Sequence, residues 1–312
     1  MRKQLVLHFG IHRTGSTSIQ KTLLDNKGKL ASMGYCYPSL FNQQGHSKAA
    51  WLLINNKITS RDLIIEIKKN IPESSHTVIL SAEDFCLLKN YEFIGELSKH
   101  YDVKLFIYVK DQVKWLESWY NQHIKWPWNK KFSSAKPSMF VSSVKDFYWI
   151  KYDDFLKRIT KHINKDSISV KVSSKEHVPN TVSDFIASIG ININDLVVEK
   201  EYNASLSFAK LQVLRAIDIY ELNAPHRVKV LRAIDSLTIG EDNGSKHIFN
   251  HQECSYIKDY FCSSNTEFFK DYFNGQRVFN NLSNRDDSIT YIPDDKIYRV
   301  YLPQVVHMLA IK

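Results

Sequence analysis

The stretch Leu5-Val-Leu-His-Phe-Gly-Ile-His-Arg-Thr-Gly-Ser-Thr17 decides the fold. Its first five residues, Leu5 to Phe9, are a short apolar run that Gly10 ends. From Ser16 onward the apolar residues recur at the spacing of a helix, as Ile19, Leu23, Leu24 and Leu30. The pattern predicts a strand, a tight turn and a helix over residues 16–33.

Strands and helices continue to alternate through the first 190 residues. Further strands are predicted at 35–38, 77–81, 103–109 and 167–172. Helices are predicted from Ser60, capped by that serine, and over 111–125, 152–163 and 178–189. The alternation predicts an α/β fold with a central parallel sheet and crossover helices.

The rest of the chain follows a different pattern. Residues 126–139 contain two prolines and two tryptophans without a sustained period, which predicts a loop. Beyond residue 207 the pattern is mostly helical, around 207–217, 228–237 and 256–273. We expect one domain over 1–312, with the core sheet in about 1–190 and a helical C-terminal extension in about 200–312.

The composition is that of a globular protein with a basic balance. The 312 residues are 43% hydrophobic, and 42 Lys+Arg against 33 Asp+Glu give a formal net charge of +9. That excess suits an anionic ligand, and it equally fits a solvated basic surface. The basic residues are spread along the chain without a nucleic-acid-binding signature, so no nucleic-acid partner is expected.

Cysteine spacing and apolar run lengths point to a compartment. The spacing of Cys36, Cys86, Cys254 and Cys262 matches neither a disulfide framework nor zinc knuckles, which predicts reduced thiols. The apolar run at Leu5 begins too early for a secretory signal, and no 18-residue apolar run follows. We expect a cytoplasmic protein without a membrane span.

The turn between the first strand and its helix carries the main functional signal. Gly10 and Gly15 have the spacing of a loop whose main-chain N–H groups hold phosphates. Ser16 stands where a nucleotide triphosphatase has lysine, and the loop's cation is Arg13. Magnesium-dependent phosphoryl transfer needs that lysine, so the substitution argues against it. A helix start that merely caps itself with Ser and Thr is the alternative interpretation.

The loop resembles the 5′-phosphosulfate loop of sulfotransferases that use 3′-phosphoadenosine 5′-phosphosulfate (PAPS), in which a Lys-Ser/Thr-Gly-Thr-Thr run occupies this place. The resembling run here is Arg13-Thr14-Gly15-Ser16-Thr17-Ser18. The resemblance implies that these residues bind PAPS in a P-loop-like, three-layer α/β fold. Arg13 replaces the usual lysine, which keeps the charge but presents a planar fork.

A second feature of that family is a basic residue at the end of a strand with a serine eight residues later. Lys110 and Ser118 have this spacing. Residues 111 and 118 are two helical turns apart, so Ser118 can face the strand end. The resemblance implies that the pair binds the 3′-phosphate, with Lys110 in place of the family's arginine. A solvated lysine at a strand end is the other interpretation.

Glu83 is the predicted base. The segment Leu80-Ser-Ala-Glu-Asp-Phe85 resembles the Ser-Ser-Glu segment of bacterial carbohydrate sulfotransferases, in which the glutamate lies beside the acceptor. The competitor Asp84 is expected to point to another side. Glu83 alternatively only caps the helix that follows it. Weaker similarities to the same subgroup, that of capsular polysaccharide and lipopolysaccharide sulfotransferases, occur at Trp115–Gln122, Asn203–Ser207 and Ser264-Asn265.

The resemblance implies direct in-line transfer of a sulfuryl group from PAPS to a hydroxyl or amine of a carbohydrate or glycolipid, leaving 3′-phosphoadenosine 5′-phosphate. Arg13 and the loop N–H groups are expected to stabilise the departing phosphate. No metal is expected, since sulfuryl carries less charge than phosphoryl. Trp126 and Trp128 are candidates for stacking on a sugar, and His46 for lining the acceptor side.

Two other functional interpretations stay open, and a metal site has to be considered. An atypical nucleotide-dependent kinase is disfavoured by Ser16. A non-catalytic PAPS-binding protein is suggested by the Arg13 and Lys110 replacements. His247 and His251 are four residues apart and followed by Cys254, but the glycine and asparagines around them predict a loop and not a metal-binding helix.

Overall fold

The structure is a computed structural model that describes residues 2–198, 205–279 and 289–310. The chain divides into two compact units. Unit 1 consists of Met1–Lys110, Tyr148–Glu201 and Ser263–Phe279; unit 2 consists of Asp111–Phe147, Tyr202–Cys262 and Asn280–Lys312. The expected single domain over 1–312 stays a prediction.

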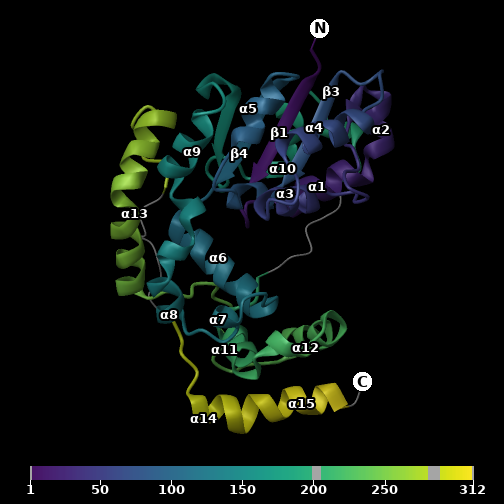
Figure 1. The fold of residues 1–312 in the computed structure, drawn as a ribbon. Coiled ribbons are helices and arrows are strands. Elements are labelled where there is room, and N and C mark those ends of the chain that lie inside the picture. The colour runs from purple at the N-terminus through teal and green to yellow at the C-terminus, as the bar shows by residue number, and fades with distance from the viewer. Residues whose placement is uncertain (1, 199–204, 280–288, 311–312) are drawn as a thin grey trace. The chain divides into compact units, whose positions relative to one another are not determined.

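Unit 1 contains a parallel sheet. Within the described residues it has five strands in the order β2-β3-β1-β4-β5, and every neighbouring pair is parallel. The strands are β1 (Gln4–Gly10), β2 (Tyr35–Cys36), β3 (Thr77–Ala82), β4 (Asp102–Val109) and β5 (Ile168–Val172). The predicted α/β fold class is confirmed, and Figure 1 shows β1 between β3 and β4.

Helices cover both faces of this sheet. On one face Val6 packs in a cluster with Ile19 and Leu23 of α1 (Ser16–Asp25) and Phe185 of α10 (Thr181–Ser188). On the other face Phe9 stacks on two buried rings that follow β3 in the chain, those of Phe85 and Phe93. Alternate residues of β1 therefore face different helical layers, which makes the unit three-layered.

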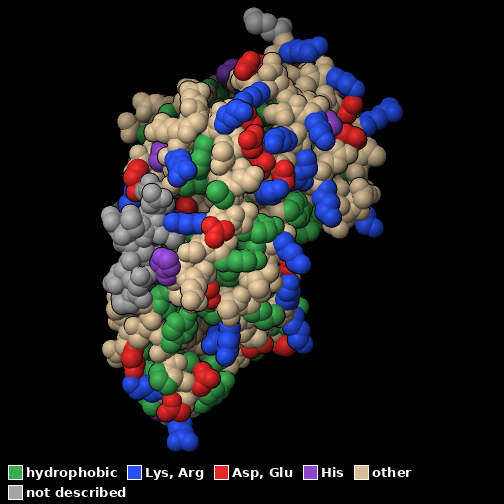
Figure 2. Space-filling model, turned by 90° about the vertical axis from the view of Figure 1, so that its left-hand side faces the viewer, with side chains coloured by type: hydrophobic (Ala, Val, Ile, Leu, Met, Phe, Trp, Pro, Cys, Tyr) green, Lys and Arg blue, Asp and Glu red, His purple; other side chains and the backbone are tan. Residues whose placement is uncertain are grey.

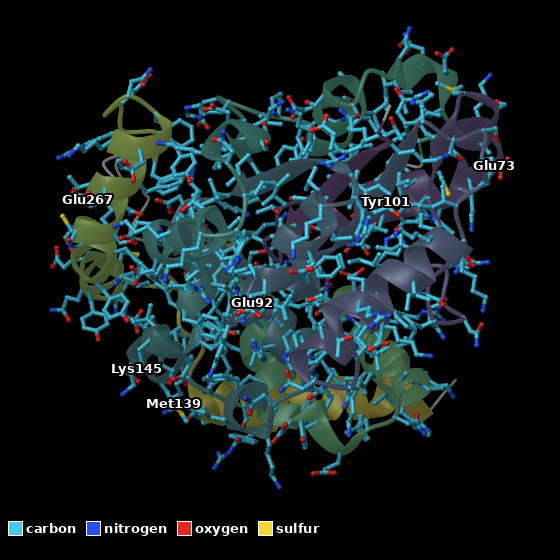
Figure 3. The ribbon with its side chains drawn as sticks, turned by 45° about the horizontal axis from the view of Figure 1, so that its top comes forward. Glu73, Glu92, Tyr101, Met139, Lys145 and Glu267 are labelled. Atoms are coloured by element: carbon cyan, nitrogen blue, oxygen red, sulfur yellow. The ribbon has the colours of Figure 1, made fainter. Side chains whose placement is uncertain are left out.

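The other helices of unit 1 are α2 (Lys27–Ser32), α3 (Ser47–Ile54), α4 (Ser60–Lys69), η1 (Glu83–Leu87), α5 (Glu92–Ser98), η3 (Tyr148–Ile150), α9 (Tyr152–Thr160), η4 (Lys165–Ser167) and η5 (Ile193–Asp195). Of these, α4 and α9 were predicted in place with different ends, and several short helices were not predicted. Tyr101, labelled in Figure 3, is buried just before β4.

Two predicted boundaries in unit 1 were wrong. The helix predicted over 16–33 is two helices, because Asn26 interrupts it: its amide donates to the carbonyl of Thr22 and to that of Val197. Ser60 is the first residue of α4 and not its cap. Thr59 is the cap, and it forms a capping box with Asp62.

Unit 2 is helical in its described residues. Its elements are α6 (Gln112–Lys125), α7 (Lys130–Ser133), α8 (Pro137–Ser142), η2 (Val144–Asp146), α11 (Phe208–Ile217), η6 (Ile219–Glu221), α12 (Ala224–Ser236), α14 (Asp294–Lys296), η8 (Ile297–Tyr301) and α15 (Leu302–Ala310). The loop predicted over 126–139 contains α7 and the start of α8. Asn129 caps α7, and Pro137 opens α8, where a missing N–H is tolerated.

The helix α13 (His251–Tyr272) has residues in both units. Ser264 and Asn265, one of the weaker sequence similarities, lie inside α13. His251 begins the helix, and His247 lies in the segment before it. In the part of the chain that the structure describes, no group of three His, Cys, Asp or Glu side chains is placed to hold a metal ion.

The surface carries charges of both signs, and the cysteines form no disulfide among the described residues. On the face drawn in Figure 2, Lys and Arg side chains are interspersed with Asp and Glu. All four cysteines lie among the described residues and are free, with Cys262 exposed and the others buried. Across the described segments no helix combines the length and the apolar character that crossing a membrane requires.

Two buried histidines beside the sheet are expected to make the stability of the fold depend on pH. His46 donates from Nε2 to the carbonyl of Pro38, 2.8 Å away, and its Nδ1 accepts from the main-chain N–H of Ser81 at 3.0 Å. His8 lies 2.7 Å from the Ser81 hydroxyl. Burial lowers the pKa of His46 to about 4 and that of His8 to about 3. Both are therefore neutral in the folded protein near pH 7.

We predict that acid unfolds the protein partly through these two groups. Between pH 6.5 and 4 the unfolded chain binds their protons and the folded chain does not, so the free energy of unfolding falls as the pH falls. In His46→Gln this dependence becomes shallower by about 1.4 kcal/mol per pH unit. Urea unfolding at several pH values measures it, with the exposed His100→Gln as control; an unchanged slope in His46→Gln would contradict the assignment.

Candidate functional site

The loop that joins β1 to α1 has an unusual backbone. Arg13 has φ +68° and Gly15 has φ +89°, so two residues of the short turn are left-handed. For arginine this conformation is uncommon and is sustained only by its surroundings. Turns that include left-handed residues direct neighbouring main-chain N–H groups into one concavity, which is a site for an anion.

Both predicted glycines are required by their contacts. A Cβ placed on Gly10 would lie 1.8 Å from the hydroxyl oxygen of Ser16 and 3.3 Å from the Cβ of Glu83. A Cβ on Gly15 would lie 2.1 Å from the hydroxyl oxygen of Thr181, the first residue of α10. The loop is therefore closed tightly against η1 on one side and against α10 on the other.

The N-terminus of α1, where Gly15 is the N-cap residue, has no side-chain cap among the described residues. The hydroxyl of Ser16 is buried and has no hydrogen-bond partner among them. Thr14 instead donates to the carbonyl of Ile11, 2.6 Å away, and so stabilises the turn itself. The self-capping alternative does not describe this helix start, and the uncapped N–H groups are suited to an anion.

The rest of the predicted loop lies at the surface or partly below it. Thr17 is exposed, whereas Ser18 and Arg13 are half-buried. The same loop carries two side-chain donors, the unpaired Ser16 hydroxyl and the Arg13 guanidinium. This is the donor set that phosphate or sulfate groups favour.

Glu83 lies beside this loop. β1 and β3 pair in register, with Phe9 opposite Ala82, so Glu83 follows directly at the level of Gly10. The side chain is half-buried. Burial raises the pKa of Glu83 and Asp84 raises it further, while the charges of His12 and Arg13 act against both. The predicted meeting of this strand end with the phosphate loop is therefore present.

His12 is the site residue that sequence reasoning missed. It lies inside the loop and is buried, with Nε2 3.6 Å from a carboxylate oxygen of Asp84 and Nδ1 3.6 Å from the sulfur of Cys86. Asp84 was expected to point elsewhere, and in the structure it reaches the loop through His12. The available signal was the position of His12 between the two glycines of the motif.

Lys110 follows the end of β4, the strand next to β1. Gly10 pairs with Tyr108, so Lys110 lies two residues beyond that register, at the carboxyl edge of the sheet where the loop begins. Tyr152 of α9 fixes its backbone: the Tyr152 hydroxyl accepts from the Lys110 N–H at 3.2 Å and donates to its carbonyl at 2.6 Å. Ser118 lies on α6 in unit 2, so its pairing with Lys110 stays a prediction.

His46 holds the end of β3. β2 pairs with β3 only as far as Cys36 and Val78, and beyond that point the Ser81 N–H bonds to His46. Because both ring nitrogens bond to the main chain, His46 supports the strand that leads to Glu83. A direct contact with the acceptor stays a prediction that this geometry does not favour.

Trp126 and Trp128 lie in unit 2, directly after α6. Trp126 is half-buried, and Trp128 is 50% exposed. The Trp128 ring packs on two aromatic residues of α6, with centroid distances of 4.1 Å to His123 and 5.0 Å to Trp119. One face of the indole is thus supported while half of the side chain stays accessible.

Comparisons with known proteins do not assign the chain to a family. No protein-family model matches the chain. An uncharacterized protein of Archaeoglobus fulgidus is 26% identical over 239 residues, which are 73% of this chain and 62% of that protein. A solved structure of retinol dehydratase in complex with androsterone and the inactive cofactor PAP aligns with 93% of this chain and 83% of its own, at 13% identity. Its TM-score of 0.32 is too low to support an argument.

We predict that Gly15→Ala destabilises the protein and that Gly28→Ala does not. Alanine at position 15 would have to adopt a left-handed conformation, which costs about 1–2 kcal/mol, and would displace Thr181. Gly28 lies in α2 with no described atom near the added Cβ, so alanine should be neutral or stabilise by up to about 1 kcal/mol. Urea unfolding of both variants measures this; equal stabilities would contradict the proposed crowding at Gly15.

Proposed function

We propose that this protein is a PAPS-dependent sulfotransferase that transfers a sulfuryl group to a hydroxyl or amine of a carbohydrate. The observation that carries the proposal is an uncapped helix start with a buried, unpaired Ser16 hydroxyl, beside which a half-buried carboxylate, Glu83, lies at the level of Gly10. An anion site and a proton acceptor on one loop are the two parts that such a transfer requires.

In this proposal the loop binds the 5′-phosphosulfate. The acceptor oxygen or nitrogen attacks sulfur in line with the bond to the bridging oxygen; the new bond to sulfur forms as the bond to the phosphate breaks. The proton of the acceptor passes to Glu83. Negative charge appears on the departing phosphate of 3′-phosphoadenosine 5′-phosphate, where the Arg13 guanidinium and the loop N–H groups stabilise it.

The environment of Glu83 suits a base. A carboxylate in water is a weak base at neutral pH, and burial makes it stronger by raising its pKa toward neutrality. The positive charges of His12 and Arg13 limit the shift, so the ionised form remains accessible. The alternative helix-capping role involves only the short η1, in whose first turn Glu83 lies.

Lys110 and Ser118 are proposed to bind the 3′-phosphate. Lys110 has the position for it within unit 1, since its backbone is fixed by Tyr152 at the carboxyl edge of the sheet. Trp126 and Trp128 are proposed to stack on the sugar of the acceptor, for which the half-exposed Trp128 indole is suited. The carbohydrate acceptor and a cytoplasmic location rest on the sequence resemblance and sequence pattern alone.

Calorimetry and a transfer assay test the proposal. PAPS should bind without magnesium and more tightly than ATP, and ³⁵S-labelled PAPS should transfer label to a cellular glycan fraction. Tighter binding of magnesium ATP would favour the kinase alternative, which Ser16 disfavours. Tight binding of PAPS without transfer to any glycan, glycolipid or small hydroxyl compound would favour the non-catalytic alternative.

We predict that Lys110→Ala and Ser118→Ala weaken PAPS more than adenosine 5′-phosphosulfate, because only PAPS carries the 3′-phosphate. The loss should be roughly 1.5–3 kcal/mol for the charged contact of Lys110. Calorimetry with both nucleotides measures it, and the exposed Lys114→Ala serves as the control lysine. Equal losses for the two nucleotides would place the pair at another part of the ligand.

We predict that Glu83→Gln lowers kcat by ~10²–10⁴-fold with little change in PAPS affinity, because the amide keeps the shape and loses the basicity. Stability at pH 7 should be unchanged or higher, since the raised pKa of Glu83 means that ionisation in the folded state opposes folding. Steady-state kinetics and thermal unfolding measure both. The exposed Glu92→Gln, at the start of α5 and labelled in Figure 3, is the matched control. A Glu83→Gln enzyme with full turnover per folded molecule would leave the base unassigned.

A further inference from the structure

His12 joins the phosphate loop to the segment that carries Glu83. Its side chain is 10% exposed and that of Asp84 14%, and the two are separated by 3.6 Å between Nε2 and the carboxylate oxygen. On the other side of the ring, Nδ1 lies 3.6 Å from the Cys86 sulfur. The Trp149 ring of η3 lies against the imidazole, with centroids 6.3 Å apart. The imidazole is therefore placed by neighbours on both of its nitrogens and on its ring.

The charges around His12 are mainly negative. Glu83 and Asp84 are adjacent residues of η1, and both act on the imidazole. Burial raises the pKa of Cys86, so its thiol is uncharged at neutral pH. Arg13 of the same loop is the nearby cation that acts on Glu83.

The charged groups of the neighbouring elements bond elsewhere. Lys48 of α3 donates to the carbonyl of Phe41. Arg158 of α9 donates to the carbonyl of Leu88 and lies over the rings of Tyr91 and Tyr148, whose hydroxyls burial keeps un-ionised by raising their pKa. The buried His12 imidazole therefore interacts mainly with the two carboxylates of η1.

Two opposing effects decide the protonation of His12. Burial favours the neutral ring and lowers its pKa. The Asp84 carboxylate, 3.6 Å from Nε2, and the charge of Glu83 act against burial and raise the pKa of His12. The direction that follows is a pKa above the ordinary value of histidine, since a buried carboxylate stabilises the imidazolium strongly where water is excluded.

We propose that His12 is a positioning residue whose positive charge ties the loop between β1 and α1 to η1 and keeps the half-buried Glu83 carboxylate ionised. The proposal rests on the proposed function insofar as Glu83 is the base. His12 itself need not touch the acceptor: it acts on Glu83 and on the loop. Without its charge, Glu83 and Asp84 would share a buried site in which Arg13 is the remaining cation of the loop, and Glu83 would take up a proton at higher pH.

The first test is the pH dependence of transfer in His12→Gln. Because ionised Glu83 is the active form, its loss sets the acid limb of the kcat profile, and this limb should move upward by about 1 pH unit. On that limb kcat falls roughly tenfold, and at high pH it returns toward the wild-type plateau. His100 is exposed and precedes β4, at the end of that strand away from Lys110, so His100→Gln should leave the profile unchanged. A uniform fall in kcat at every pH would overturn the proposal, because a purely structural role predicts that result.

The second test does not depend on activity. ¹³C NMR of protein labelled at the Glu carboxyls, with Glu83→Gln for assignment, should show Glu83 titrating about 1 pH unit higher in His12→Gln than in wild type. An unchanged Glu83 midpoint would overturn the proposal even in an active enzyme. Conversely, a shifted midpoint in a protein that transfers no sulfuryl group would uphold the link and refute the proposed function.

A further variant keeps the test decisive if His12→Gln does not fold. Asp84→Asn removes one carboxylate and leaves the loop sequence intact. ¹⁵N NMR of labelled histidine should show His12 doubly protonated at pH 8 in wild type, with a midpoint lower by about 1 pH unit in Asp84→Asn. A wild-type His12 that is already neutral at pH 7 would overturn the proposal.

Discussion

The close approach of the chain at Gly10 is the constraint on which the other features of unit 1 depend. β1 ends there, and the Ser16 hydroxyl and Glu83 come so near that a Cβ has no room. This contact brings three segments together: the central strand, the start of α1 and the end of β3. The start of α1, the half-buried Glu83 carboxylate and His12 are gathered around this contact. A larger residue at position 10 would push the start of α1 and Glu83 away from the end of β1.

Much of this arrangement was predictable from the sequence because it is local. The apolar run of β1, the glycine spacing and the helical period of α1 are each encoded within a few residues. Parallel pairing then places the ends of β1, β3 and β4 at one edge, so the neighbourhood of the loop and Glu83 follows from topology. The position of Lys110 at that edge follows in the same way, since it directly follows a strand that pairs with β1.

The remainder depends on contacts between distant residues, which no local pattern contains. The break at Asn26 is specified by the backbone of Val197, and the burial of His12 depends on η1 and on Trp149. The short helices α7 and α8 are too brief for a period to show, and only their cap residues, Asn129 and Pro137, indicate them. The two main-chain bonds of His46 were not predictable either, because they join the ring to Pro38 and to Ser81, which lies 35 residues further along the chain.

The contact between Gly15 and Thr181 has a consequence for the order in which the protein is made. The loop is synthesised well before α10, which packs against it and begins only at Thr181. The bond between Asn26 and Val197 spans 171 residues of sequence in the same manner. Such long-range closure makes folding slow, so the nascent chain must carry an unfinished loop until most of unit 1 has been synthesised.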